Sequence, residues 1–156
     1  MSKLNTTAVN LRSLVAVVAA LLVGPVFAAD ISLTGTSLIQ NGLDNLANIE
    51  QVAGTTGGIN SNYASVIQAG NDNVAEIVQT GSGNRIELTQ NGNGNQFNAQ
   101  QTGSENSIMA QQFGNASATL IQNGSNNSIQ LYQAAGQNVA YVSQSGSGNR
   151  AVIMQR

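Results

Sequence analysis

A regular spacing of glutamine runs through most of the chain. Glutamines recur every eleven residues, with one longer interval after Gln51 and one shorter interval after Gln112. An asparagine stands six residues before nearly every one of them, the exceptions being Thr34 and Ala116. The unit is therefore N-x5-Q, followed by a short link that usually contains glycine. Self-similarity at a constant period is typical of repeat architectures, in which each unit packs on its neighbours.

The five residues between Asn and Gln alternate in character. Their second and fourth places are apolar in every unit from Asn45 onward, whereas the first, third and fifth are mixed. In one unit Ile86 and Leu88 are the apolar pair, and Arg85, Glu87 and Thr89 surround them. Because side chains alternate faces along a strand, both amides and both apolar side chains share one face. The pattern predicts eleven strands of about seven residues, separated by Gly and Asn turns.

Composition alone permits a second interpretation. Asn and Gln make up more than a quarter of residues 29–156. Such a composition is typical either of a disordered, prion-like tract or of a repeat protein whose amides stack. A disordered tract would not keep the apolar residues at the same two places in unit after unit, so the alternation favours the repeat.

The apolar face decides how the predicted strands are arranged. A single meandering sheet would leave this face in water, whereas two facing sheets about 10 Å apart bury it. We therefore expect an all-β fold, a two-sheet parallel β-solenoid of about 5.5 rungs of 22 residues. Rungs spaced about 4.8 Å apart would let each buried amide donate to one neighbour and accept from another.

The predicted amide ladder supplies the candidate residues for polymerisation. They are Asn45, Gln51, Asn62, Gln68, Asn73, Gln79, Asn84, Gln90, Asn95, Gln101, Asn106, Gln112, Gln122, Asn127, Gln133, Asn138, Gln144, Asn149 and Gln155. Glycines two places after a ladder glutamine can take positive φ where the chain reverses. These turn glycines are Gly42, Gly70, Gly81, Gly92, Gly103, Gly124 and Gly146.

The first residues have the features of a secretory signal peptide. Lys3 and Arg12 precede an apolar run over residues 14–23, and small residues follow up to Ala28. This order predicts cleavage after Ala28. The predicted organisation is a signal peptide at 1–28, a short mature segment at 29–33 and a solenoid at 34–156.

The missing residue types exclude several classes of function. The chain has no His and no Cys, so it offers no Ser-His, Cys-His or His-metal arrangement and no disulfide. A net charge of -2 gives no basic patch for nucleic acid. Glu76 and Glu87 are one repeat apart and would lie on opposite outer faces, which does not suit a catalytic pair. We expect no enzymatic activity, no cofactor, no metal, no nucleic acid and no small-molecule substrate.

The ends of the predicted solenoid indicate how it would associate. Residues 29–33 are expected to be too few to cover the first rung, and only Arg156 follows Gln155. We therefore expect both terminal rungs to expose unpaired backbone N–H and C=O groups. A head-to-tail contact between such edges does not close and yields a filament. The alternative is a soluble binding solenoid. An ice-binding module would need a flat outward array of Thr, and the outward places here vary.

The repeat resembles that of the curlin family. Intact Q-x-G-x-x-N-x5-Q copies begin at Gln40, Gln68, Gln79, Gln90, Gln101, Gln122 and Gln144. The resemblance implies a secreted subunit of a Gram-negative bacterium that crosses the outer membrane through the curli secretion pore with accessory factors. At the cell surface it would polymerise with itself and a sister curlin into curli, the adhesive amyloid fibre of biofilms. In that family the stacked Asn and Gln positions drive assembly.

Departures from the family pattern bear on the type of subunit. The chain passes from Ala29 almost directly into the first repeat, and it ends on a repeat. Both features are similar to the minor, nucleating curlin rather than the major one. The regular last repeat departs from the nucleator's pattern, and the major fibre subunit is the alternative. Residues 52–61 form a longer link, predicted to be a bulged turn or, alternatively, a docking loop.

Overall fold

The computed structural model describes residues 14–18, 29–33, 35–53 and 62–156, and these contain strands and no helix. Helices capable of crossing a membrane are accordingly absent from these ranges. The strands are β1 (Leu14–Val18), β2 (Ala29–Leu33), β3 (Thr36–Asn41), β4 (Leu46–Ala53), β5 (Tyr63–Ala69), β6 (Val74–Ser82), β7 (Arg85–Asn91), β8 (Gln96–Ser104), β9 (Ser107–Phe113), β10 (Ser117–Ser125), β11 (Ser128–Gln133), β12 (Val139–Ser147) and β13 (Arg150–Gln155).

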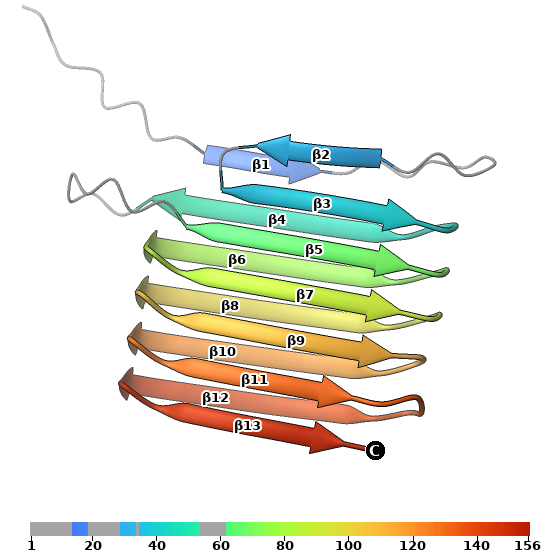
Figure 1. Cartoon of the computed structure of the whole chain (residues 1–156). Helices are drawn as coiled ribbons and strands as arrows, with labels where there is room; N and C mark the ends of the chain where they lie inside the picture. The colour runs from blue at the N-terminus through green and yellow to red at the C-terminus, as the bar shows by residue number, and fades with distance from the viewer. Residues whose placement is uncertain (1–13, 19–28, 34, 54–61) are drawn as a thin grey trace, which may run out of the picture.

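From β3 to β13 the chain alternates between two sheets (Figure 1). One sheet has the order β4-β6-β8-β10-β12 and the other β3-β5-β7-β9-β11-β13, and all these pairs are parallel. Equivalent places pair in register, so that Gln79 lies beside Gln101 and Gln101 beside Gln122. The predicted two-sheet parallel β-solenoid is confirmed.

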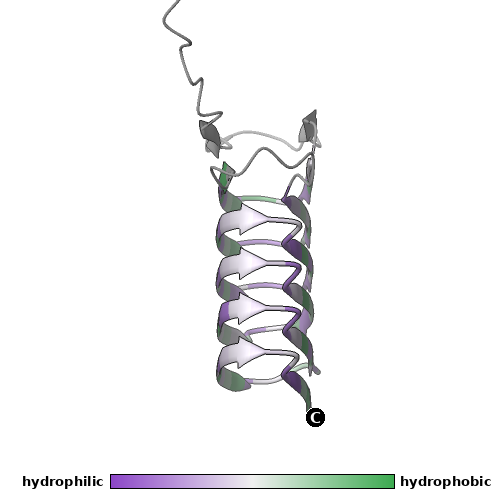
Figure 2. Cartoon of the chain, turned by 90° about the vertical axis from the view of Figure 1, so that its left-hand side faces the viewer, coloured by the Kyte–Doolittle hydropathy of each residue, from purple (hydrophilic) through white to green (hydrophobic). Residues whose placement is uncertain are grey.

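The core lies between the sheets, where the alternation places the apolar residues. Figure 2 shows the two sheets facing each other, with hydrophobic residues coloured green in both. Residues at the second and fourth places are almost fully buried from β4 to β11, as with Ile77, Ile86 and Leu120 at 0% exposure. Val142, Ala151 and Ile153 are only partly buried. They lie in the last two strands, where no further rung covers them.

The short link after Gln112 is accommodated by a tight turn. Gly114 adopts a φ of 70° there, and β10 remains in register with both β8 and β12. One missing residue is therefore absorbed outside the sheets. In the longer link, residues 54–61 lie outside the described part of the chain.

The two ends of the stack differ. β1 pairs antiparallel with β4, and β2 pairs antiparallel with β3, so both strands of the first rung have a partner on their outer side. The expectation that residues 29–33 are too few to cover the first rung is therefore wrong for β3, because five residues suffice to pair with an open strand edge. The partner of β4 is β1, which lies within the predicted signal peptide. At the other end, β12 and β13 are the outermost strands of their sheets.

Candidate assembly site: the amide ladders and the terminal rungs

Each sheet carries a continuous column of glutamine side chains. The Nε2 of each glutamine donates to the Oε1 of the next rung's glutamine at 2.7–3.0 Å. The columns run from Gln51 to Gln144 in one sheet and from Gln40 to Gln155 in the other. The interior glutamines are fully buried. Burial in a poorly polar core strengthens these bonds and makes an unpaired amide costly.

The same glutamines also join the two sheets. The second N–H of Gln101 donates to the backbone carbonyl of Arg85 at 3.1 Å, and that of Gln112 to the carbonyl of Gln96 at 3.0 Å. In both cases the carbonyl belongs to the facing sheet, sixteen residues earlier. The bond recurs in successive rungs and was not predicted from the sequence. Each of these two glutamines stands sixteen residues after the first residue of the preceding strand, and this constant spacing could have indicated the bond.

The asparagines form ladders that run in the opposite sense. Asn106 donates its Nδ2 to the Oδ1 of Asn84 at 3.0 Å, and its backbone N–H donates to the same oxygen. Its Nδ2 also donates to the carbonyl of Gly124 at 2.9 Å. Equivalent side-chain bonds link Asn45, Asn73 and Asn95 in one column and Asn62, Asn84, Asn106, Asn127 and Asn149 in the other.

One predicted ladder residue lies outside the ladder. Ala116 occupies the asparagine place in the rung before Asn138, and Asn138 instead donates to the carbonyl of Ala134 at 2.8 Å. The missing amide therefore interrupts a single column. Within the described ranges, no buried side-chain N or O atom lacks a hydrogen-bond partner. The core thus holds many amides without leaving any unsatisfied.

The predicted turn glycines all have φ between 101° and 127°. Their need for glycine is steric as well as conformational. A Cβ on Gly103 would lie 1.9 Å from the carbonyl oxygen of Gly124 in the next rung. Gly81 has the same relation to Gly103, and Gly124 to Gly146. The glycines therefore permit neighbouring turns to stack at the spacing of the strands.

Two polar features of the first rungs were not predicted from the sequence. Asn71 and Asn93 accept backbone N–H bonds from Leu43 and Asn71 respectively, at 3.0 and 2.8 Å, and so form a ladder within the turns. Thr36 is buried and donates its hydroxyl to the Oε1 of Gln51 at 2.9 Å. The hydroxyl thereby occupies one lone pair of the first glutamine of that column.

The outer faces carry isolated polar and aromatic contacts. Arg85 forms an ion pair with Glu87 and lies 4.6 Å from the centroid of the Tyr63 ring. Glu76 lies in the opposite sheet from Glu87 and accepts from Asn98 at 3.0 Å. In the ranges that the structure covers, no three potential metal ligands come together. These outer-face contacts are pairs open to solvent.

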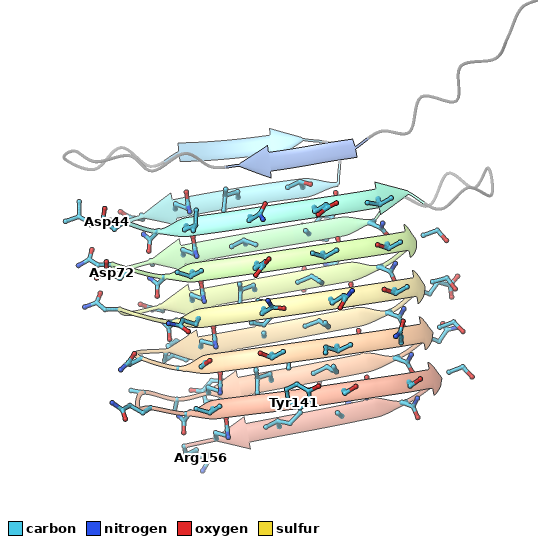
Figure 3. The ribbon with its side chains drawn as sticks, turned by 180° about the vertical axis from the view of Figure 1, so that it is seen from behind. Asp44, Asp72, Tyr141 and Arg156 are labelled. Carbon is cyan, nitrogen blue, oxygen red and sulfur yellow. The ribbon has the colours of Figure 1, made fainter. Side chains whose placement is uncertain are left out.

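The terminal rungs differ in charge and in free hydrogen-bonding capacity. Asp44 and Glu50 belong to the first rung, and Arg150 and Arg156 to the last. Figure 3 labels Asp44 and Arg156 at the two ends of the stack. Gln144 and Gln155 donate one N–H each to a backbone carbonyl of the facing sheet. Within the described residues no further rung follows β12 and β13, so the second N–H of each, which the inner glutamines donate to the next rung, has no ladder acceptor there. The last rung is therefore an incomplete ladder.

Comparison with known families gives a match in two segments of the chain. A family model described as the Curlin associated repeat matches residues 60–92 and 124–156. Curated proteins and solved structures yielded no match to the chain. The first matched segment includes β5, β6 and β7, and the second includes β11, β12 and β13. Both segments thus have the two-amide repeat geometry described above. The Curlin associated repeat model thus matches two separate parts of the solenoid.

Proposed function

We propose that the protein is the minor curlin subunit, which nucleates curli polymerisation at the cell surface. The curlin repeats support a fibre subunit. The nucleating role rests on the last rung, where β12 and β13 end the two sheets and the Gln144 and Gln155 ladders stop with an unused N–H. Such an edge can template an incoming chain by β-strand addition.

The expected gain from one junction is large enough to drive assembly. Two strands at each end would form about ten backbone hydrogen bonds, each contributing roughly 0.5–1.5 kcal/mol. Amide bonds that continue both glutamine columns add to this gain. Because the contact is head-to-tail, repeated association produces a filament.

The proposal includes an order of events before assembly. Residues 1–28 act as a secretory leader, and the solenoid of residues 34–156 passes the outer membrane through the curli secretion pore with accessory factors. β1 lies within the leader and pairs with β4. Removal of the leader would uncover β4 and leave β2 on the other half of that rung. The intact precursor would therefore assemble more slowly than residues 29–156.

Seeding tests the nucleating role. Purified residues 29–156, added at a small molar fraction to an unpolymerised major curlin, should shorten the lag before amyloid-dye fluorescence rises. The full chain, which retains β1, is the matched control and should shorten it less. If residues 29–156 form dye-positive fibres alone but do not affect the major curlin, the chain is the major subunit. If they remain monomeric and dye-negative for days, the fibre function itself is contradicted and a soluble binding solenoid is favoured.

A further inference from the structure

The first and last strands of the solenoid lie in the same sheet. β3 and β13 both belong to the sheet that contains β5, β7, β9 and β11. The solenoid therefore ends on a half rung. This parity restricts how a second copy can continue the stack.

A direct head-to-tail continuation, without rotation, leaves a gap. If β3 of the next copy pairs with β13, the following strand β4 lies in the other sheet, half a rung further on. In that sheet, one strand position between β12 and the next copy's β4 is then empty. The gap would expose the apolar core beside Val142 and leave the free N–H of Gln144 without an acceptor.

A half-turn about the stack axis removes the gap. We infer that successive copies are related by this half-turn, so that β12 pairs with β3 of the next copy and β13 with its β4. The half-turn moves each strand of the next copy into the other sheet and reverses its direction. Because the strands of the two sheets run in opposite directions (Figure 1), both new pairs are parallel. The exchange is possible because both sheets are built from the same N-x5-Q unit. This junction rests on the proposed function and specifies how its subunits meet.

The residues brought together by the half-turn match along both strands. Gln155 lies beside Gln51 of the next copy, and Gln144 beside its Gln40, so both glutamine columns continue. Asn149 lies beside Asn45, and Ile153 beside Ile49. The Oε1 of Gln51 already accepts from Thr36, but a carbonyl oxygen has a second lone pair for the N–H of Gln155. The ladder amides of the last rung thus obtain the same kind of partner that the equivalent amides have inside the stack.

Charge also favours the half-turn. It places Arg150 beside Leu46 of the next copy, two residues from Asp44, and Arg156 beside Val52, two residues from Glu50. Asp44 and Arg156 lie on the same lateral side of the molecule (Figure 3), so in the unrotated junction Arg156 would approach Asp44 of the next copy. Glu50 of the next copy would then lie in the sheet opposite both arginines. Only the half-turn therefore provides each arginine with a nearby carboxylate of its own.

The junction requires the first rung to be uncovered. β1 would be lost with the leader, and β2 would have to leave β3. The β2–β3 pair is antiparallel and spans five residue pairs. The junction replaces it with parallel pairing along β3 and with the amide bond from Gln144 to Gln40, which an antiparallel Ala29–Leu33 strand does not supply. The exchange thus favours the pair between β12 and the next copy's β3, which is longer than the β2–β3 pair and also includes the side-chain amide bond.

Disulfide trapping distinguishes the two junctions, and the chain has no native cysteine to interfere. The half-turn places Val152 beside Asn48 of the next copy, whereas the direct stack places it beside Ser37. All three side chains point outward, so their replacement leaves the core intact. Neighbouring strands bring such Cα atoms within disulfide range. Fibres of residues 29–156 carrying Asn48→Cys and Val152→Cys should, after mild oxidation, give covalent multimers in at least about tenfold higher yield than fibres carrying Ser37→Cys and Val152→Cys.

Controls separate the junction from the proposed function. Each single-cysteine variant should remain monomeric on a non-reducing gel. Preferential cross-linking of the 37/152 pair, or equal low yields from both pairs in dye-positive fibres, would overturn the half-turn while leaving the fibre function intact. A cysteine-free chain that forms no fibres would contradict the fibre function, and the junction with it.

Discussion

Replacing Gly103 by Ala should abolish assembly of residues 29–156 over the period in which the unmodified chain assembles completely. The added Cβ would lie 1.9 Å from the carbonyl oxygen of Gly124, which belongs to the backbone of the next rung. The φ of 115° at Gly103 is also unfavourable for any residue with a Cβ. Relief requires the two turns to separate, which would break the bond from Asn106 to Gly124. We expect a cost of more than about 3 kcal/mol.

Gly114→Ala is the matched control. Gly114 also has positive φ, at 70°, but its nearest neighbour would be an ordinary 3.6 Å from the new Cβ. The expected cost is about 1–2 kcal/mol from backbone conformation alone. Dye fluorescence and sedimentation of both variants, at equal concentration, measure the difference. Equal assembly by the two variants would show that the close stacking of turns does not limit the fold.

Gln101→Ala should have the second large effect. It removes the acceptor of Gln79 and the donors to Gln122 and to the Arg85 carbonyl, all in or near the buried core. Each unsatisfied buried group costs about 1–3 kcal/mol. We therefore expect at least about 3 kcal/mol of destabilisation and a lag several times longer than that of the unmodified chain. The denaturant concentration that dissolves the fibres should fall in parallel.

The neighbouring residue provides the control for this variant. Gln100 precedes Gln101 in β8 but points outward and is exposed. Gln100→Ala removes the same side chain without entering the core, and surface changes of this kind usually remain within about 0.5 kcal/mol. If the two variants showed the same lag, the amide ladder would not be the source of stability.

The repeat made much of the fold predictable. The spacing of Gln and the alternation between Asn84 and Gln90 together define strand length, facing side and register, since a slip of one residue would expose every apolar side chain. Gly103 and its equivalents were predictable because each follows a ladder glutamine by two places. These features follow from the spacing within the repeat, without any knowledge of which residues come into contact.

Other features depend on contacts that the repeat does not encode. β1 and β2 belong to segments outside the periodic region, so their pairing with β4 and β3 could not be read from spacing. The donation from Gln101 to the Arg85 carbonyl depends on the separation of the sheets at the core edge. Asn138 could join the asparagine ladder only if the preceding rung supplied an amide at the same place, and that place holds Ala116.

X-ray diffraction from aligned fibres of residues 29–156 tests most directly whether the stack of parallel rungs continues from one copy to the next. Strands perpendicular to the fibre axis should give a sharp meridional reflection near 4.8 Å, with an equatorial reflection near 10 Å from the two facing sheets. A pattern without the meridional reflection, obtained from well-aligned fibres, would contradict this account.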